Sequence, residues 1–444
     1  MSTVAIIGAG ISGLGAAYSL QKMGHTVDVF EQTQFVGGRM RTFREHGYTW
    51  DIGAQFMVDS YSNMKSLMKE LGIAQDVSYV HPIQAMATDL HQIFRFASGS
   101  PASLLRHPKL SFRSKLAIFK VMGLAMKHRK HLDFHSYERL GDLDNGHDLS
   151  WWRNQTTDDL VDWVLGVPTS TLFFWAEKET PWYSALLSLL DAKKTWSIYS
   201  PNSGMGIVTQ KLGARVPVHI NSPVLSVQST TDNQVRVTIQ SNFGQVERFF
   251  DKVIIATPAP IALSMLENPV LELGQEQTNF LEQTKYTANL TTGIGYKSAP
   301  EKQAYGFAVP SALKSSLAAI GWDHLKGSER APAGCGLAVA MPTHAYSLAN
   351  WNRTDEEIQA DVVKMVSDYY EESHQNLVFS RLHRWRYAMP IIYPGWVHPL
   401  RNALNAKLPE KAKIYTCGDY WAGPTTEHAL LSGYRTARQV ALNQ

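Results

Sequence analysis

Three glycines near the N-terminus have the spacing of a nucleotide-binding turn. Gly8, Gly10 and Gly13 form a G-x-G-x-x-G pattern directly after a short apolar run. The first glycine permits a tight turn, the second lets the backbone approach a pyrophosphate, and the third allows a helix to pack closely on a strand. The N-terminus of the following helix offers free N–H groups and a partial positive charge to phosphates. The pattern therefore predicts that the chain binds a dinucleotide.

An acidic residue follows this turn at the distance that ribose recognition requires. Glu31 ends a second apolar run, and its carboxylate can accept hydrogen bonds from both hydroxyls of an adenosine ribose. Its negative charge would repel a 2′-phosphate, so NADP is disfavoured. Gly37-Gly38-Arg39 comes six residues later and offers a second close backbone approach together with a forked cation. A nicotinamide-binding unit does not need this second element.

Strand and helix signals surround the turn in the order that a nucleotide-binding unit requires. Residues 3–7 and 26–30 are apolar runs typical of parallel strands. Between them the periodicity is helical as far as Met23, and Gly24 ends the helix. Residues 48–55 are predicted to form a short strand that enters a glycine-containing loop.

The rest of the chain divides into a helical stretch and a return to strands. Residues 60–190 have a mainly helical pattern without a strong strand signal, which indicates an inserted domain. Helices are also predicted at 356–370 and from about Thr426 to Leu442. Further strands are predicted at 216–220, 224–228, 235–239, 252–256, 286–296, 336–341, 381–387 and 413–417.

Composition narrows the classes of protein that this chain can be. Its 444 residues are 44% hydrophobic and 18% charged, which suits a large globular core and excludes a disordered or fibrous protein. The two cysteines, Cys335 and Cys417, exclude a disulfide framework and a cysteine-based zinc site, and fit a reducing compartment. The 16 histidines show no metal-binding spacing, so no metal site is expected.

Charge and hydropathy indicate where in the cell the protein is expected and which classes of partner it is not expected to bind. A net charge of +3 gives no support for global binding of nucleic acid. No apolar run reaches the roughly 18 residues of a membrane span, and the N-terminus has the pattern of a strand, turn and helix rather than a signal peptide. A cytoplasmic protein is therefore expected.

Motifs along the whole chain resemble one flavoprotein group. The N-terminal GAGISGL, Glu31, GGR at 37–39 and DIGAQ at 51–55 resemble the group of flavin-dependent monoamine oxidases, protoporphyrinogen oxidases and phytoene desaturases. Residues 203–206 through 221–224 resemble that group's return to the nucleotide domain. TCGD at 416–419 with ALLSG at 429–433 resembles its C-terminal flavin motif.

The resemblance implies an α/β fold with FAD between two discontinuous domains. A Rossmann-type FAD-binding domain would comprise residues 1–60, 200–275 and 405–444. A discontinuous α+β substrate domain would comprise residues 61–199 and 276–404.

The resemblance also implies positions for the cofactor. These are the pyrophosphate at Gly8, Gly10, Ser12 and Gly13; the adenosine ribose at Glu31; the phosphates at Gly38 and Arg39; the isoalloxazine at Gly53, Ala54 and Gln55; the adenine at the backbone of Val224; and the ribityl chain or phosphates at Gly418 and Asp419. The helix that begins near Thr426 would point its N-terminus at the flavin N1–C2=O edge. There its dipole favours the negative charge of the reduced flavin.

Three departures from the amine-oxidase pattern bear on function. Covalent attachment in monoamine oxidases uses a cysteine shortly before Pro-Gly, and Tyr393-Pro394-Gly395 has no cysteine nearby, so noncovalent FAD is expected. Many amine oxidases place a lysine near flavin N5, on the strand that here is 286–296, which contains none. They also flank the flavin with two tyrosines, at positions that by our count are Ala388 and Thr425. All three favour the protoporphyrinogen oxidase and desaturase side.

The resulting expectation is an FAD-dependent oxidase or desaturase. It would take a hydride from a largely apolar, ring-containing substrate, with Trp385, Tyr393 and Trp421 as tentative contacts. Dioxygen is expected as the acceptor because no second dinucleotide fingerprint is present. An amine oxidase, a redox-neutral flavin-dependent isomerase and a flavin-loaded binding protein remain as alternatives.

A basic segment could serve a further partner. Between Asp89 and Asp133 there are nine lysines or arginines and no acid. Residues 111–127 form an amphipathic pattern that fits a surface helix in peripheral contact with anionic lipid, or a solvated helix over a core. The basic residues share one face and apolar residues lie roughly opposite: Arg113, Lys120 and Lys127 against Ile118, Phe119, Met122 and Met126.

Noncovalent attachment gives a direct prediction. Acid or heat precipitation of the yellow protein should release all of its flavin into the supernatant, because no cysteine precedes Gly395. Absorbance of the supernatant and of the washed pellet measures the two fractions. Flavin that stays with the precipitated polypeptide would show that the expectation is wrong.

Overall fold

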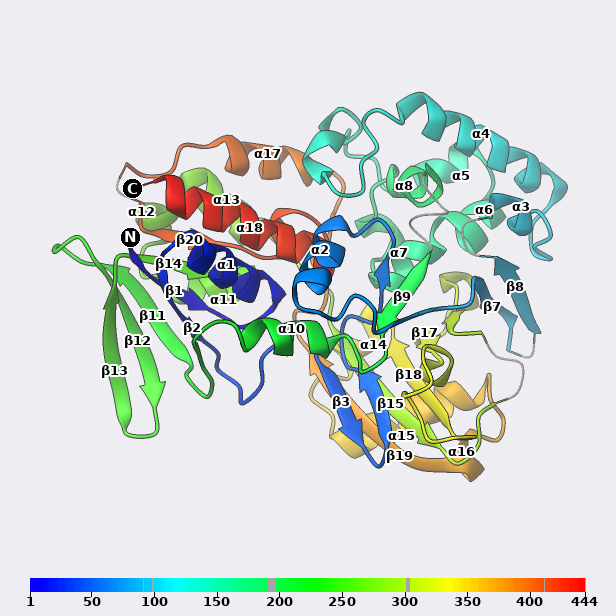
Figure 1. Ribbon diagram of the computed structural model, residues 1–444. Helices are drawn as coiled ribbons and strands as arrows, with labels where there is room; N and C mark the ends of the chain where they lie inside the picture. Colours follow the sequence, from blue (N-terminus) through cyan, green and yellow to red (C-terminus); the bar gives the residue numbers. More distant parts are fainter. Residues whose placement is uncertain (91, 98–99, 191–196, 301–303, 411, 444) are drawn as a thin grey trace.

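Two domains with different sheets make up the molecule. The computed structural model describes residues 1–444 except 91, 98–99, 191–196, 301–303, 411 and 444. In Figure 1 the blue N-terminal strands, the green middle strands and the red C-terminal helix gather in one domain, so this domain is built from segments far apart in the sequence. The other domain combines a large sheet with the cyan helices at the upper right.

A five-stranded parallel sheet forms the centre of the first domain. In spatial order its strands are β10 (Val218–His219), β2 (Thr26–Phe30), β1 (Thr3–Ile7), β14 (Lys252–Ile255) and β20 (Ile414–Thr416). Strands β1, β14 and β20 are buried on both faces, as parallel strands flanked by helices must be, whereas the edge strand β10 is half-buried. This sheet confirms the predicted α/β fold class with a Rossmann-type unit.

Two long helices of this domain touch backbone to backbone. Helix α1 (Ile11–Lys22) follows β1, and helix α18 (Thr426–Leu442) packs against it. A Cβ on Gly433 would lie 2.2 Å from the carbonyl oxygen of Ser12, and a Cβ on Gly15 would lie 2.6 Å from the Leu430 side chain. A side chain at Gly433 would force the helices apart, so this glycine fixes how the C-terminal helix meets the nucleotide turn, whereas a side chain at Gly15 would displace the end of Leu430.

A seven-stranded mixed sheet forms the second domain. Helix α15 (Asp355–Ser367) covers it with Ile358, Val362 and Val366, and a capping box of Thr354 and Glu357 starts that helix. All neighbouring strands are antiparallel except the pair β16 and β7. In spatial order the strands are β19 (Leu377–Trp385), β15 (Asn289–Tyr296), β18 (Gly336–Pro342), β17 (Leu317–Gly321), β16 (Gly306–Ala308), β7 (Ile83–Asp89) and β8 (Gln92–Ala97).

Helices and small sheets complete both domains. The helices of the second domain pack around a core that contains Trp152 and Trp182. The other helices are α2 (Ser62–Glu70), α3 (Pro101–Leu104), α4 (Phe112–His128), α5 (Trp151–Gln155), α6 (Asp158–Leu160), α7 (Val167–Leu172), α8 (Ser184–Leu190), α10 (Gly206–Gly213), α11 (Ala259–Ser264), α12 (Pro269–Leu273), α13 (Gln275–Gln283), α14 (His344–Ala349), α16 (Ser373–Asn376) and α17 (Val397–Asn405). The small sheets are β3 (Thr42–Glu45) with β4 (Tyr48–Asp51); β5 (Met57–Val58), β9 (Ile198–Pro201) and β6 (Val77–Tyr79); and β11 (Val224–Ser229), β12 (Val235–Ser241) and β13 (Gly244–Phe250).

The stretch at 60–190 is mainly helical, as predicted, but it also contains strands that the sequence did not signal. Strands β6, β7 and β8 lie within it, and β7 and β8 form one edge of the seven-stranded sheet. Strand β7 has the sequence IQAMATD and is buried at five successive positions, so it shows no alternation of apolar and polar residues. Its alanines and methionine also favour a helix.

The exact boundaries of the two domains remain a prediction. The strands of the five-stranded sheet come from segments 1–60, 200–275 and 405–444, and those of the seven-stranded sheet come from segments 61–199 and 276–404. In the described part of the chain, no helix is long and apolar enough to cross a membrane.

Candidate active site

A cavity of about 420 Å³ lies between the two domains. The glycine-rich turn and the start of α18 form one end of its wall, and strand β15 contributes Asn289 and Thr291. Residues in and next to helices of the second domain, among them Val164, Leu165 and Phe173, form the other end. Because ligands of this sheet type bind at the carboxyl ends of the strands, the position of the cavity fits a bound dinucleotide.

The glycine-rich turn has the geometry that its spacing predicted. Gly8 has a φ of 104° and donates its N–H to the carbonyl oxygen of Phe30 at 2.8 Å. A Cβ on Gly13 would lie 2.1 Å from the Gly8 carbonyl oxygen, so only glycine fits there. Gly10 faces open space and lines the cavity together with Ser12. The backbone is therefore accessible to a ligand at the position expected for the pyrophosphate.

The second glycine pair packs directly on the first turn. Gly37 donates its N–H to the carbonyl oxygen of Ala9 at 2.8 Å, and Gly38, with a φ of 51°, faces the Cα of Gly10. The loop that follows β4 is held in the same way: Ala54 donates its N–H to the carbonyl oxygen of Arg39 at 2.8 Å.

The three residues predicted to line the isoalloxazine share this loop. A Cβ on Gly53 would lie 2.1 Å from the Arg39 carbonyl oxygen, so this position also requires glycine. Gly53, Ala54 and Gln55 all line the cavity.

One ion pair joins the two ends of the chain at the cavity. The Arg39 guanidinium donates to both oxygens of Asp419, at 2.7 and 3.0 Å, and to the carbonyl oxygen of Ala388 at 2.9 Å. Gly418 beside it donates its N–H to the Ser432 hydroxyl at 3.1 Å. The structure thus pairs two side chains that were each expected to reach the cofactor, and their individual roles toward phosphates and ribityl chain remain predictions.

Glu31 and Val224 do not line the cavity itself. Glu31 is 8% exposed, and its carboxylate accepts hydrogen bonds from the N–H groups of Ala9 and Thr33, both at 3.0 Å, and from the Thr33 hydroxyl at 2.9 Å. Glu31 therefore anchors the glycine-rich turn as well as offering an acceptor beside it. Val224 is buried at the start of β11, and its contact with adenine remains a prediction.

The N-terminus of α18 faces the cavity. Thr425 is its N-cap and accepts a hydrogen bond from the N–H of His428, while Thr425, Thr426 and Ala429 line the cavity. Burial lowers the pKa of His428 to about 3, with the nearby His135 adding to the effect. His428 is therefore neutral and adds no charge to the partial positive charge at the helix N-terminus.

Unpartnered buried oxygens test whether a polar cofactor fits here. Among the described residues, Gln55 Oε1, Thr257 Oγ1 and Thr426 Oγ1 are buried without a hydrogen-bond partner, and all three residues line the cavity. Buried polar atoms normally have partners, so orphans such as these around one cavity indicate a ligand that carries its own donors and acceptors. The cradle of turn, loop and helix end fits FAD.

The substrate contacts expected from the sequence are only partly brought together. Trp385 lines the cavity, and its indole N–H donates to the carbonyl oxygen of Ile52. Tyr393 and Trp421 are not part of the described cavity wall. Trp421 is buried against Phe280, with ring centroids 4.8 Å apart, so it packs in the core instead of facing substrate.

Residues 11–441 match the family described as flavin-containing amine oxidoreductases. The chain belongs to this family. Its members' flavin chemistry makes the protein an FAD-dependent oxidoreductase, in agreement with the cradle described above.

Curated relatives of this flavoenzyme match it over short stretches. Protoporphyrinogen oxidase 2 of Arabidopsis thaliana is 43% identical over 72 residues, which are 16% of this chain and 14% of that protein. Zeta-carotene desaturase of Capsicum annuum is 32% identical over 103 residues, which are 22% of this chain and 18% of that protein. The matches thus span less than a fifth of these relatives.

Solved structures resemble the flavoenzyme over its whole length. A redesigned putrescine oxidase has a TM-score of 0.79 at 18% identity, with 100% of this chain and 99% of that chain covered. A putative protoporphyrinogen oxidase from Exiguobacterium has a TM-score of 0.74 at 16% identity, with the same coverage. At such identities the likeness shows the fold.

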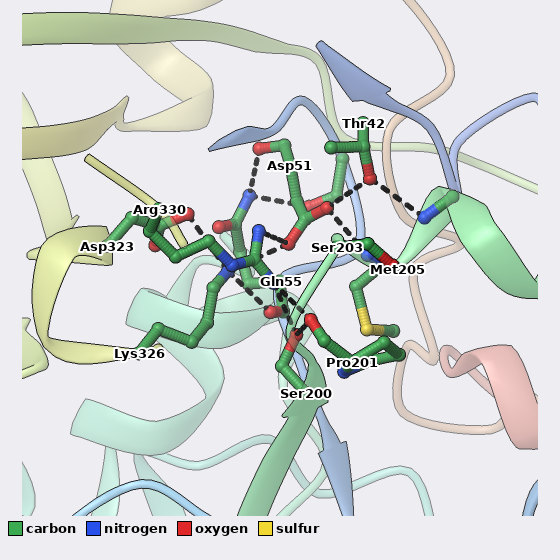
Figure 2. Close-up of polar contacts among 12 residues, drawn as sticks. Thr42, Asp51, Gln55, Ser200, Pro201, Ser203, Met205, Asp323, Lys326 and Arg330 are labelled. Atoms are coloured by element: carbon green, nitrogen blue, oxygen red, sulfur yellow. Dashed lines mark hydrogen bonds and ion pairs between the residues drawn. The ribbon is translucent and has the colours of Figure 1, made fainter. Parts of the chain in front are cut away.

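A buried cluster of four charged residues lies beside residues 53–55 of this flavoenzyme, a loop that we call the flavin loop. Asp51, Asp323, Lys326 and Arg330 are all at most 1% exposed. The Lys326 ammonium lies 2.9 Å from Asp51 Oδ2 and 3.0 Å from Asp323 Oδ2, and it donates to the carbonyl oxygen of Gln55 at 2.8 Å (Figure 2). The cluster therefore holds the loop that lines the cavity.

The cluster also joins three parts of the chain. Arg330 donates to Asp51 Oδ2 at 2.9 Å, to the Ser200 hydroxyl at 2.7 Å and to the carbonyl oxygen of Pro201 at 2.9 Å (Figure 2). Burial raises the pKa of the Asp51 carboxyl, but the positive charges of Arg330 and Lys326 outweigh this and hold it below its ordinary value. Asp51 thus stays ionised.

Sequence reasoning missed this cluster. Asp51 was noted only as part of the DIGAQ motif, and Lys326 and Arg330 carry no local signal because they meet Asp51 only after folding, 275 and 279 residues along the chain. Thr257, Asn289 and Thr291 were missed for the same reason.

Replacing Glu31 tests the predicted ribose position. Glu31→Ala removes acceptors worth roughly 1.5–3 kcal/mol per charge-assisted bond, so we expect FAD affinity to fall at least about tenfold. Equilibrium dialysis followed by flavin absorbance measures the affinity, and circular dichroism checks that the protein remains folded. Thr33→Val is the matched control, because it removes one partner of Glu31 but keeps the carboxylate. Equal affinity in Glu31→Ala and wild type would contradict the assignment.

Replacing Lys326 tests the buried cluster. Lys326→Met leaves Asp51 and Asp323 short of a cation, and breaking a buried pair costs about 3–5 kcal/mol of unfolding free energy. Urea titration followed by tryptophan fluorescence measures the loss. The control Lys65→Met breaks the half-exposed pair of Lys65 with Asp59 and should cost less than about 1 kcal/mol. Similar losses in the two variants would refute the role given to the cluster.

Proposed function

We propose that this flavoenzyme is an oxidase or desaturase that removes a hydride from a C–H bond of a largely apolar, ring-containing substrate. The observation that carries the proposal is the charge of the cavity wall. Among the described lining residues, only Arg39 and Asp419 are charged, and they neutralise each other. A charged substrate would lose its hydration without gaining a partner there, so an uncharged, apolar substrate is favoured.

The wall next to strand β15 supports the same choice. The strand contributes Asn289 and Thr291 to the cavity, and no lysine lies among the described lining residues. Ala388 and Thr425, the positions at which amine oxidases are expected to carry tyrosines, both line the cavity and neither is aromatic. The resemblance to amine oxidases therefore lacks the residues associated with amine oxidation, and simple primary amines should be poor substrates.

The chain's own residues would orient the reaction. FAD supplies the hydride acceptor when it is bound. The α18 N-terminus at Thr426 places a partial positive charge where reduction adds negative charge, and Trp385 offers an aromatic surface on the substrate side. The apolar walls exclude water from the reacting C–H bond.

We further propose dioxygen as the final acceptor and noncovalent attachment of FAD. The first point rests on the lack of a second dinucleotide fingerprint, and the second on the lack of a cysteine near Gly395. A cytoplasmic location is proposed on the sequence alone. A fatty acid isomerase from P. acnes shares the fold, with a TM-score of 0.71 at 14% identity, so a redox-neutral reaction is the alternative that the experiment must separate.

Anaerobic mixing with substrate distinguishes these reactions. Screening pyrrolic, indolic and polyene compounds should identify one that bleaches the yellow absorbance stoichiometrically, because net oxidation leaves electrons on the cofactor. Admitting air should restore the colour and yield hydrogen peroxide. A primary alkyl amine is the control and should bleach slowly. Turnover without bleaching or peroxide would indicate an isomerase, and rapid peroxide production from the amine would indicate an amine oxidase.

A further inference from the structure

Helix α4 exposes an apolar ridge along its outer face. Phe112, Leu116, Phe119 and Met126 are 77%, 54%, 59% and 55% exposed. Their spacing of four, three and seven residues places them on one side of the helix. The opposite side is buried and consists of Ser114, Ile118, Val121 and Ala125.

The apolar residues that the sequence placed opposite the basic residues of this helix do not all face the same way in the structure. Ile118 faces the core, whereas Phe119 and Met126 face outward. A helix that merely covers a core would direct these large side chains inward.

Basic side chains flank the ridge. Arg113, Lys120 and Lys127 follow its residues at seven-residue spacing, and Lys115 lies on its other side. Within the described chain, none of these four cations has a carboxylate oxygen within 4.0 Å. Lys120 donates to the carbonyl oxygen of Gln155 at 2.7 Å and stays exposed. The positive charge around the ridge is thus not neutralised by the fold.

The acids nearest to α4 are engaged elsewhere. Asp159 lies on the buried side of the helix and accepts from the Ser111 N–H at 2.7 Å and from the Ser114 hydroxyl at 2.6 Å. Arg153 pairs with three further acids of the same region, Asp158, Asp162 and Glu177. The outer face consequently presents large apolar side chains among cations, which is the chemistry of a surface that lies in a lipid headgroup layer.

Helix α4 lies next to the apolar end of the cavity, with the ridge on the face that points away from the core. Helix α4 packs on α8, whose Ala185 and Leu187 line the cavity. The segment that leads into α4 contributes Phe96 and Leu104 to the same wall. In Figure 1, α4 lies at the outer edge of the helical region, away from the parallel sheet.

We propose that the outer face of α4 docks on an anionic lipid bilayer. The aromatic and aliphatic ridge would enter the headgroup region while the flanking cations pair with acidic lipids. Docking brings the apolar end of the cavity beside the medium in which an apolar substrate dissolves. That last consequence rests on the proposed function, whereas the docking itself does not.

Vesicle co-sedimentation of the flavin-loaded protein tests the proposal. The probes are phosphatidylcholine vesicles with and without phosphatidylglycerol. We expect binding to the anionic vesicles at low salt, at least about tenfold weaker binding to the neutral ones, and release as salt rises. No substrate or turnover is involved, so a failure here leaves the proposed reaction intact, and an error in the reaction leaves the docking intact.

Two variants, each with a matched control, separate the contribution of the cations to vesicle binding from that of the apolar ridge. Arg113→Glu, Lys120→Glu and Lys127→Glu together should weaken binding to anionic vesicles at least about tenfold. Lys69→Glu, Lys211→Glu and Arg438→Glu together make the same change of net charge on other helices and should have little effect.

The second variant, Phe112→Ser with Leu116→Ser and Phe119→Ser, should also weaken binding. Its control, Phe243→Ser with Leu271→Ser, removes side chains that are 101% and 69% exposed elsewhere.

Three outcomes would overturn the proposal. The first is no sedimentation with anionic vesicles at low salt. The second is equal loss in a variant and its control, which would show that general charge or hydrophobicity is responsible. The third is a concentration-dependent dimer, seen by analytical ultracentrifugation, that the ridge variant abolishes while vesicle binding persists, which would make a second copy of the chain the occupant of the ridge.

Discussion

The ionised carboxylate of Asp51 is the constraint on which the cavity depends. One of its oxygens accepts from Thr42 and from the N–H of Met205, and the other faces Lys326 and Arg330. It thereby ties the hairpin before the flavin loop to the return segment and to the second domain. Because removing any member would leave a buried charge uncompensated, the cluster fixes where the domains meet, and the cavity lies along that junction.

The wall of the cavity also contains few charged side chains, and these are paired. Its only described charged pair, Arg39 with Asp419, joins residues 380 apart and closes the cradle from both ends of the chain. The backbone adds partial positive charge at the N-termini of α1 and α18. A site built in this way can favour negative charge on a cofactor without offering a free ion to the substrate, which is consistent with hydride removal from an uncharged molecule.

Local signals predicted the nucleotide half of the fold and several elements of the second domain, among them strands β15, β18 and β19 and helix α15. Gly8, Gly13 and Gly53 occupy positions where a Cβ would be strained or would clash, so their identities alone reported the turn and the loop. Strand β7 was missed because burial on both faces removes alternation, and the Lys326 cluster was missed because its members meet only in the folded chain. Trp421 looked like a substrate contact by proximity in sequence, yet it packs on Phe280.

Unlike the cavity wall, the outer surface of helix α4 contains cations without carboxylate partners among the described residues. Arg153 nevertheless pairs with three acids a short distance away. Pairing those acids with Arg153 leaves the α4 surface positive, and burying Ile118 and Val121 leaves Phe112 and Phe119 to solvent. Exposing these side chains does not stabilise the fold, because burying each of them would contribute about 1.5–3 kcal/mol to the free energy of folding. A surface with this cost is most simply explained by a partner that removes it from water.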